Sequence, residues 1–423
     1  MLTSQVLSTA IMAASDNSMS RSSSATAAAI SVYAGGLILG MTLVSVPASS
    51  ALLKQLHGFD DAQYGAIYLP QLLSAIVGGL GGGLLTNALG TKHLLALSLG
   101  CLLMAQLALA SSAVLPPEAA LLALMITTGC IGLGIGLGSG PLNAYPVALF
   151  PAVSNTALTA LHTIVGVGMM LAPIYLSTFA QHDNWLSGVI ALSAVTLGVT
   201  LIALVAQFPP IATATTTTTN AAARPERHTL FWICAAIAVI YSVAEGIFSN
   251  WAMLFIQEER GMDAATASLA LTCFWGALTG GRLLASFIVI RVPPLAFLLA
   301  LPPMMTAAFC LLPITEGAAG LIGAFAFAGM ACSAYFPMLV AYAAGAFPQR
   351  VAWIASMMIT AQMVGIGLGT YVIGLIKSTA SITTLYYAAT TLPAATLLLI
   401  AVGRHLVGSP SLHLIKASSV RPS

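Results

Sequence analysis

Apolar segments recur along almost the whole chain, and each is long enough to cross the roughly 30 Å hydrocarbon core of a bilayer as a helix. Only 6% of the 423 residues are charged and 59% are hydrophobic, whereas soluble domains carry about 25% charged residues. The sequence therefore predicts an all-α, multi-pass membrane protein. Twelve transmembrane helices are predicted, over residues 26–51, 62–88, 93–114, 119–148, 154–179, 185–207, 230–256, 264–289, 293–313, 316–345, 351–376 and 382–403.

The placement of basic residues predicts the orientation of these spans. With both termini in the cytoplasm, ten of the 13 lysines and arginines fall on the cytoplasmic side, in accord with the positive-inside rule. Only Lys54, Arg260 and Lys377 fall outside. Loss of one span would reverse this pattern downstream of the lost span, so an even number of spans is favoured. We expect a protein of the cytoplasmic (inner) membrane with both termini cytoplasmic.

The chain divides into two halves of six spans each. A polar stretch of low complexity, residues 209–229, separates residues 26–208 from residues 230–404 and is expected to be a flexible cytoplasmic linker. The halves echo each other, because Val165-Gly166-Val167-Gly168 recurs as Val364-Gly365-Ile366-Gly367. Such pseudo-symmetric halves are typical of transporters whose site lies between the repeats. Residues 1–25 and 405–423 are expected to be a disordered N-tail and a C-tail.

The seventh predicted span, from Leu230 to Trp251, holds a single carboxylate, Glu245. A charge at the centre of a bilayer costs roughly 2.5–3.5 kcal/mol even on mild insertion scales, so Glu245 is expected to face protein or a water-filled cavity. On a helix it shares one face with Tyr241, Ser242 and Ser249. The functional interpretation is a carboxylate that binds a proton or substrate in a transport cavity. The alternative is a structural acid that bonds a neighbouring helix.

Other polar and aromatic side chains within the spans are weaker candidates for a substrate cavity. Tyr68 and Gln71 share a helical face with Tyr64 and offer hydrogen-bonding groups for a polyol, although a helix contact explains them equally well. Asn143 and Gln362 carry amides deep in their spans, where amides also join helices.

Three further side chains have both a functional and a structural interpretation. His162 is a candidate for substrate binding or proton relay, with a hydrogen-bonded histidine as the alternative. Trp275 is a candidate for stacking on a sugar ring, with bundle packing as the alternative. Trp251 lies off the Glu245 stripe and reaches the cavity only if the helix bends at Gly246.

Several classes of function find no support. The six cysteines lie in apolar runs without CxxC pairs or neighbouring histidines, so neither disulfides nor a metal site is indicated. The glycine-rich spans lack the strand and the Lys-Ser/Thr of a nucleotide loop. A net charge of +2 without a basic patch does not indicate nucleic acid. No nucleophile with a base or paired carboxylate lies within the spans, so neither an enzyme nor a cofactor is expected.

The loop after the second span resembles the signature of the major facilitator superfamily: glycine, three residues, aspartate, two residues, glycine and then basic residues. Here these positions are Gly83, Asn87, Gly90 and Lys92. The resemblance implies a gating loop that turns tightly at its glycines, although Asn87 replaces the aspartate of the charged latch. Arg282, in Gly280-Gly281-Arg282-Leu283 of the eighth span, is placed with this gating group or as an interfacial anchor.

Further motifs are similar to the fucose-permease-like branch of that superfamily. They are Gly132 to Gly136 with Asn143-Ala144-Tyr145, Leu161-His162 before Gly166, Gly168 and Pro173, the set Tyr241, Glu245 and Trp251, and Phe274-Trp275-Gly276. The resemblance implies a sugar/proton symporter with acids in its first and fourth helices. Residues 26–51 and 119–148 contain no acid, so sugar specificity does not carry over. Proton coupling then falls to Glu245, since desolvation favours the neutral form of a buried carboxyl group.

The resemblance and the residues together predict a secondary active transporter of a small polar solute, with a sugar as one candidate, coupled to protons and working by alternating access. The alternative within the same class is an efflux carrier for amphipathic compounds, and a non-transporting membrane sensor or enzyme is a third possibility. The expected partners are a small-molecule solute, protons and the lipid bilayer, with no nucleic acid and no metal. A monomer is expected.

Overall fold

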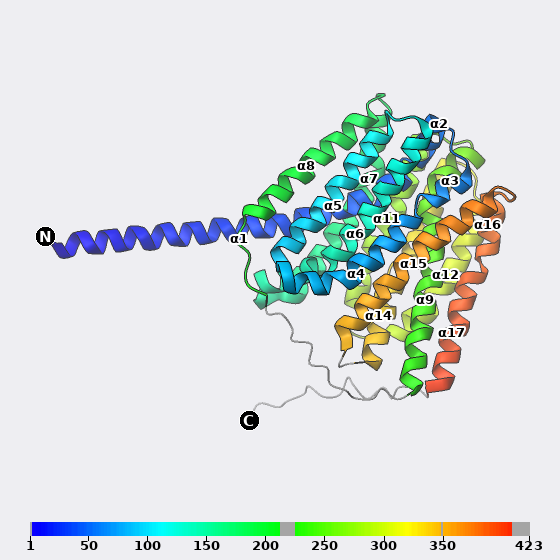
Figure 1. Ribbon diagram of the computed structural model, residues 1–423. Coiled ribbons are helices and arrows are strands. Elements are labelled where there is room, and N and C mark those ends of the chain that lie inside the picture. Colours follow the sequence, from blue (N-terminus) through cyan, green and yellow to red (C-terminus); the bar gives the residue numbers. More distant parts are fainter. Residues whose placement is uncertain (1, 212–224, 348–349, 408–423) are drawn as a thin grey trace.

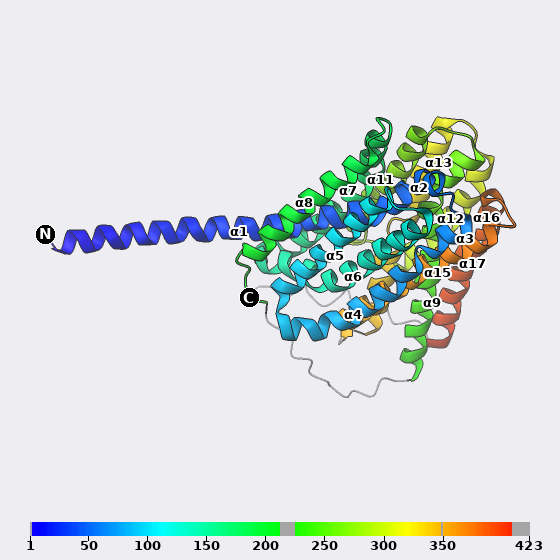
Figure 2. The same ribbon diagram turned by 45° about the horizontal axis from the view of Figure 1, so that its top comes forward.

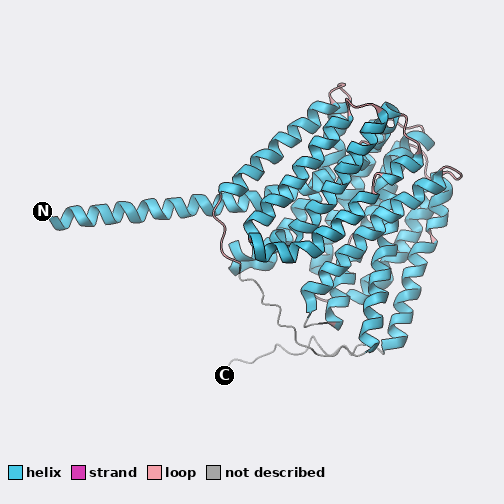
Figure 3. Ribbon diagram, in the orientation of Figure 1, coloured by secondary structure: helices cyan, strands magenta, loops and turns pink. Residues whose placement is uncertain are grey.

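The computed structural model describes residues 2–211, 225–347 and 350–407, and its regular elements within these ranges are helices (Figure 3). Twelve of the helical segments are long and apolar enough to cross a membrane, and they coincide with the predicted spans to within a few residues. Helices satisfy every backbone hydrogen bond within one segment, which is why lipid-spanning chains adopt them. Most of the expected linker, residues 212–224, and the tail from residue 408 onward lie outside the described residues.

The first half contains spans one to six. Its elements are α1 (Leu2–Ala48), α2 (Ser50–His57), α3 (Asp61–Ala66), α4 (Leu69–Leu89), α5 (Thr91–Ser112), α6 (Pro117–Leu149), η1 (Pro151–Val153), α7 (Ser154–Ala180) and α8 (Trp185–Val205). Figure 1 shows α1 extending from the bundle as a straight helix, whereas a tail of low order was expected for residues 1–25, and Figure 2 shows the same extension from a second direction. This segment is rich in alanine and serine and has neither glycine nor proline, so nothing in it breaks a helix.

The second half contains spans seven to twelve and lies beside the first (Figure 1). Its elements are α9 (Pro225–Asn250), α10 (Ala252–Leu254), η2 (Phe255–Glu259), α11 (Ala264–Ile288), α12 (Pro294–Ile314), α13 (Ala318–Cys332), α14 (Tyr335–Ala346), α15 (Val351–Lys377), α16 (Ile382–Ala389) and α17 (Thr391–Val407). We call the end at which α8 stops and α9 starts the linker end, and the opposite end the far end.

The halves pack together along a seam chiefly at two places, where α7 contacts α11 and where α15 contacts α3 and α4. Glycines bring the helices close together at both places. A Cβ atom at Gly166 of α7 would lie 2.3 Å from Oγ1 of Thr279 on α11, and one at Gly374 of α15 would lie 2.5 Å from the backbone oxygen of Asp61. Only glycine allows such an approach of two helices. The seam is therefore closely packed at these points.

The tenth span is interrupted between α13 and α14. Pro337 has no N–H group to donate to the carbonyl oxygen of Ser333, four residues earlier, so this oxygen is free to accept a bond from another helix. Arg282 of α11 supplies that bond through Nε at 3.0 Å. The hydroxyl of Tyr241 donates to the neighbouring carbonyl oxygen of Cys332 at 2.9 Å. The break thus positions two side chains in the interior of the second half.

Candidate functional site

Glu245 lies in the third of α9 nearest the far end and is only 4% exposed. Its Oε2 accepts a hydrogen bond from Nε2 of Gln362 on α15 at 3.4 Å. The other polar members of its predicted stripe are engaged with backbone: Ser242 donates to Ala238 and Ser249 donates to the backbone oxygen of Glu245. The predicted polar stripe therefore reduces to one buried carboxylate that has the Gln362 amide and the Tyr241 hydroxyl beside it, and Glu245 and Gln362, both predicted from sequence, do meet.

Arg282, expected with the gating group or as an interfacial anchor, is partly buried on α11. Its side chain reaches the interruption of the tenth span, where Nε is bound to Ser333. Its positive charge acts through space on Glu245 of its own half and on His162 of the other half. No carboxylate of the described residues lies within 4.0 Å of Arg282. Arg282 is thus a central cation with a charged neighbour but no contact ion pair.

His162 and Asn143 meet on the first-half side of the seam. Nε2 of His162 lies 3.1 Å from Oδ1 of Asn143, and the amide nitrogen of Asn143 donates to the backbone oxygen of Ser139. His162 is one turn beyond Gly166 toward the linker end, and Arg282 is one turn beyond Thr279 in the same direction. Since Gly166 and Thr279 touch across the seam, His162 and Arg282 lie on facing helices at the same depth.

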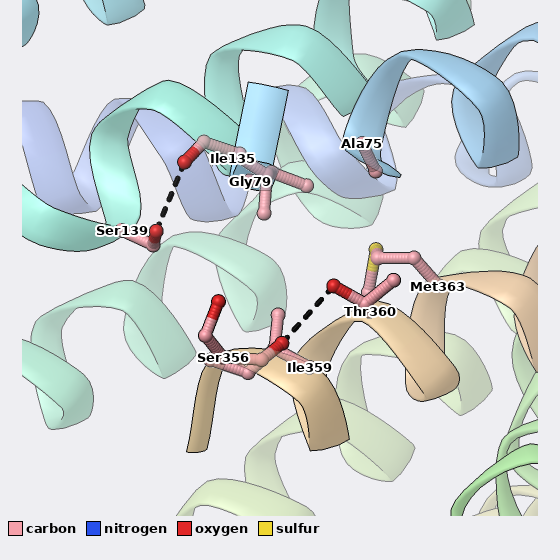
Figure 4. Close-up of a pocket in the computed structure, with 9 residues that line it drawn as sticks. Ala75, Gly79, Ile135, Ser139, Ser356, Ile359, Thr360 and Met363 are labelled. Atoms are coloured by element: carbon pink, nitrogen blue, oxygen red, sulfur yellow. Dashed lines mark hydrogen bonds between the residues drawn. The ribbon is translucent and has the colours of Figure 1, made fainter. Parts of the chain in front are cut away.

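A recess opens between the halves on the linker side of Gln362. It is narrow, with room for about one water molecule, about 10 Å³. Figure 4 shows the lining side chains, with those of α4 and α6 on one side and those of α15 on the other: Ala75, Gly79, Ile135, Gly136, Ser139, Ser356, Ile359, Thr360 and Met363. Two lining residues connect the recess with a central polar cluster, by which we mean Glu245, Gln362, Arg282, His162 and Asn143. Ser139 accepts a hydrogen bond from Asn143, and Met363 follows Gln362 in the chain.

Tyr68 and Trp251 belong to a layer that closes the seam nearer the far end. The hydroxyl of Tyr64 donates to the backbone oxygen of Asn250 at 2.8 Å and lies 3.0 Å from the hydroxyl of Tyr68. The indole of Trp251 is fully buried against the ring of Tyr64, with the ring centroids 5.1 Å apart. These two predicted cavity residues therefore have partners in the closed layer and not at Glu245.

Gln71 and Trp275 are buried side chains without a contact to Glu245 among the described hydrogen bonds. Gln71 is 4% exposed on α4. The helices α4 and α6 pack closely there, because a Cβ atom added at Gly132 of α6 would lie only 2.2 Å from the backbone oxygen of Gln71. Trp275 is 6% exposed and meets the ring of Phe274 edge-on at 5.1 Å, and its indole N–H has no partner among the described residues. Both remain candidate cavity residues, with helix packing as their observed environment.

The predicted gating loop forms a tight turn between α4 and α5. Gly90 joins the two helices with φ of 80°, a left-handed conformation that favours glycine. Gly83 and Asn87 are exposed on the last turns of α4, and Lys92 is half-buried in the first turn of α5. The glycine turn is present, while a latch that involves Asn87 remains a prediction.

Four charges at the far end form a ring that sequence reasoning did not find. Nζ of Lys54 lies 2.5 Å from Asp61 and 2.9 Å from Glu258, and Nζ of Lys377 lies 2.9 Å from Asp61 and 2.7 Å from Glu258. Lys54 and Asp61 belong to the first half, and Glu258 and Lys377 to the second. We call this ring the far-end clasp. Lys54 and Asp61 lie seven residues apart at the connection between the first two spans, but Glu258 and Lys377 come from two other connections remote in sequence, so no local motif reveals the whole ring.

Two six-helix halves, a closed far end, and a polar cluster between them are the features of a membrane transporter. Residues 28–370 match the family model described as Major Facilitator Superfamily, and the chain belongs to this family. Members of this family are transporters, a class that is typically not enzymatic. Among the described residues, no group of three or more His, Cys, Asp or Glu side chains is arranged to hold a metal ion.

Solved structures of transporters share the fold at low sequence identity. A mutant of the nucleoside transporter NupG is similar with a TM-score of 0.70 and 15% identity, over 90% of this chain and 99% of that chain. A D-xylose-proton symporter is similar with a TM-score of 0.69 and 15% identity, over 88% and 97% of the two chains. A bacterial homologue of the human lysosomal transporter Spinster has a TM-score of 0.66 and 13% identity, over 90% and 95%. No curated protein matches the sequence.

Proposed function

We propose that this transporter moves a small polar solute together with protons, that Glu245 is the proton site, and that the solute binds between the halves beside Glu245, Arg282 and His162. The observation that carries the proposal is the burial of Glu245 at 4% exposure beside two uncharged groups, the Gln362 amide and the Tyr241 hydroxyl. An ionisable group inside a membrane span is costly and is by default functional. Its hydrogen-bonding neighbours are uncharged and no ion pair of the described residues fixes its charge, so the carboxyl group can gain and lose a proton.

Alternating access would use the seam. The far end is closed by the Tyr64–Asn250 hydrogen bond and by the far-end clasp, while the recess lies on the linker side of the central residues. The distribution of basic residues supports a cytoplasmic linker end. The recess would then be the route between the central cluster and the cytoplasm, and a rocking of one half against the other would open the far end.

The finer family placement stays part of this proposal. Similarity to the fucose-permease-like branch rests on the short motifs around Asn143, His162 and Glu245, and the D-xylose-proton symporter shows that a sugar/proton carrier has the same fold. A cytoplasmic (inner) membrane, proton symport and a sugar-like solute agree with these motifs. We infer no sugar identity from them.

The test is uptake into proteoliposomes of a panel of sugars, sugar acids and amphipathic compounds, with and without an inward proton gradient. The wild type should accumulate at least one compound against its gradient, and Glu245→Gln should lose accumulation while retaining exchange of that compound. Glu118→Gln, which changes an exposed acid at the start of α6, is the matched control and should behave as the wild type. Accumulation driven by pH at full rate in Glu245→Gln would refute the assignment of the proton site.

A further inference from the structure

Arg282 is held by a hydrogen bond on one side of its guanidinium group, from Nε. Nε donates to the carbonyl oxygen that Pro337 leaves free in the tenth span. The two terminal nitrogens make no hydrogen bond or ion pair with any residue that the structure describes. Arginine remains charged in proteins and offers a planar pair of donors that fits carboxylate and phosphate oxygens.

The position of Arg282 makes these free donors available to a solute. Its side chain is partly exposed, and its charge acts on His162 across the seam as well as on Glu245. The groups that face Glu245 are Arg282 from α11, Tyr241 from α9, Cys332 from α13 and the uncharged Gln362 from α15. Arg282 is thus the one cation among the charged groups that act on Glu245 in the described part of the chain.

The charge balance of this cluster depends on the proton at Glu245. With Glu245 ionised, its negative charge offsets that of Arg282 through space. With Glu245 protonated, the guanidinium charge has no counterpart, which is expensive in a low-dielectric interior. A solute that brings one negative charge restores the balance.

We propose that the transported solute carries an anionic oxygen group, a carboxylate or a phosphate, that binds the free terminal nitrogens of Arg282 when Glu245 is protonated. This inference rests on the proposed function and assigns its substrate class. One proton and one monoanion then bind together, so their joint movement carries no net charge. No covalent step is involved. The solute binds more weakly as the pH rises, because ionised Glu245 competes with it for the charge of Arg282.

The first experiment measures equilibrium binding to the purified full-length chain by calorimetry and by thermal stabilisation. The probes are gluconate, lactate and benzoate, each paired with an uncharged analogue, namely glucose, propane-1,2-diol and benzyl alcohol, with glucose 6-phosphate as the phosphate arm. At least one carboxylate should bind at pH 5.5 and bind at least about tenfold more weakly at pH 8, as expected when binding one anion requires one proton. Its uncharged analogue should not bind. Glucose 6-phosphate is compared at pH 5.5 alone, because its phosphate gains a second charge near pH 6. Comparison of gluconate with glucose 6-phosphate separates the carboxylate from the phosphate source.

The second experiment compares variants at the same site. Arg282→Gln should weaken binding of the anion by about 30-fold or more, the usual cost of truncating one member of a buried charge pair. Arg282→Lys should keep a preference for anions with a loss of about tenfold, since a lysine supplies the charge without the two-pronged geometry. Arg291→Gln, at an exposed turn after α11, is the matched control and should bind as the wild type.

Three results would overturn the inference: no anion binds the wild type, an uncharged analogue binds as well as its anion, or Arg282→Gln binds the anion as the wild type does. If Arg282→Gln fails to fold, Arg282→Lys and the pH dependence of the wild type decide the question. Glu245→Gln separates this inference from the proposed function, because it should bind the anion without pH dependence. If protons drove uptake of an uncharged solute and this uptake required Glu245, the anion site at Arg282 would be refuted while the proton site at Glu245 would stand.

Discussion

Nζ of Lys54 lies 2.9 Å from Oε1 of Glu258, and this ion pair joins the first half of the chain to the second. The second contact of the same kind joins Lys377 to Asp61 at 2.9 Å. The other two pairs of the far-end clasp, Lys54 with Asp61 and Lys377 with Glu258, each lie within one half. If the halves part at the far end, each lysine keeps one carboxylate. Opening the clasp therefore strands no charge, which lowers the cost of breaking it.

The first prediction concerns this clasp. Glu258→Gln removes one pair between the halves and should shift the population toward a far end that is open. The expected shift is at most about fivefold, because Glu258 is 36% exposed and solvent screens its pairs to roughly 1 kcal/mol. The measurement is the distance distribution between spin labels at the exposed positions Gln55 and Thr379, in a cysteine-free background and in nanodiscs.

The same labels provide the control for the clasp. Glu316→Gln changes an exposed acid in the connection before α13, outside the ring, and should leave the distribution unchanged. High salt should reproduce part of the Glu258→Gln effect in the wild type, since salt screens exposed charges. An unchanged distance distribution in Glu258→Gln at low and high salt would show that the clasp does not hold the far end closed.

The second prediction separates Glu258 from its neighbour Glu259. The carboxylate of Glu259 accepts from the backbone N–H groups of Ile382 and Thr383 at the start of α16 and from the Thr383 hydroxyl, so it caps that helix within the second half. Glu259→Gln should lower the free energy of unfolding by about 1–2 kcal/mol, the usual cost of losing a helix cap. Thermal melting of the purified protein measures it.

Glu259→Gln should leave the spin-label distances between the halves unchanged, since its partners lie in its own half. Glu258→Gln should have the opposite profile, with a change in distances and little loss of stability. If the two variants gave the same profile, the division of labour between these adjacent glutamates would be wrong.

The third prediction concerns the hydroxyl of Tyr64, which donates to the backbone oxygen of Asn250 across the seam. Tyr64→Phe keeps the ring contact with Trp251 and removes this bond, so it should cost about 1 kcal/mol of far-end closure. The spin-label pair described above reports it. The control is Tyr371→Phe on α15, where the half-buried tyrosine hydroxyl makes no hydrogen bond with the described residues, and it should have no effect. A closed distribution in Tyr64→Phe that matches the wild type would contradict the prediction.

The spans were predictable because length and hydropathy are local properties. The described helices confirm all twelve to within a few residues, and Gly90 forms the predicted turn. Which residues become neighbours in space is not a local property of the sequence. Gln362 lies 117 residues from Glu245, and both were candidates, yet nothing in the sequence shows that they bind each other.

Arg282 shows the same limit in another form. Counting charges places it at the cytoplasmic end of its span, and the rule that long cationic side chains reach toward the interface favours an anchor. The structure turns the side chain inward because Pro337, on a different helix, frees a carbonyl oxygen. A proline 55 positions away decides the direction of an arginine only once the helices are packed.

The last prediction concerns the packing of α7 on α11 at the seam. A Cβ atom at Gly166 would lie 2.3 Å from Oγ1 and 2.6 Å from Cγ2 of Thr279, which forces the two helices apart. Gly166→Ala should therefore reduce thermal stability and transport, at a cost of about 1–3 kcal/mol as for other overpacked sites. Thr279→Ala removes these two atoms and leaves only its Cβ atom, at 2.9 Å, so the double variant should recover part of the loss. Gly198→Ala is the matched control, because nothing lies within 4 Å of its Cβ position, and it should be neutral or stabilising by up to about 1 kcal/mol. Equal losses in Gly166→Ala and in the double variant would show that a different contact sets the distance between the halves.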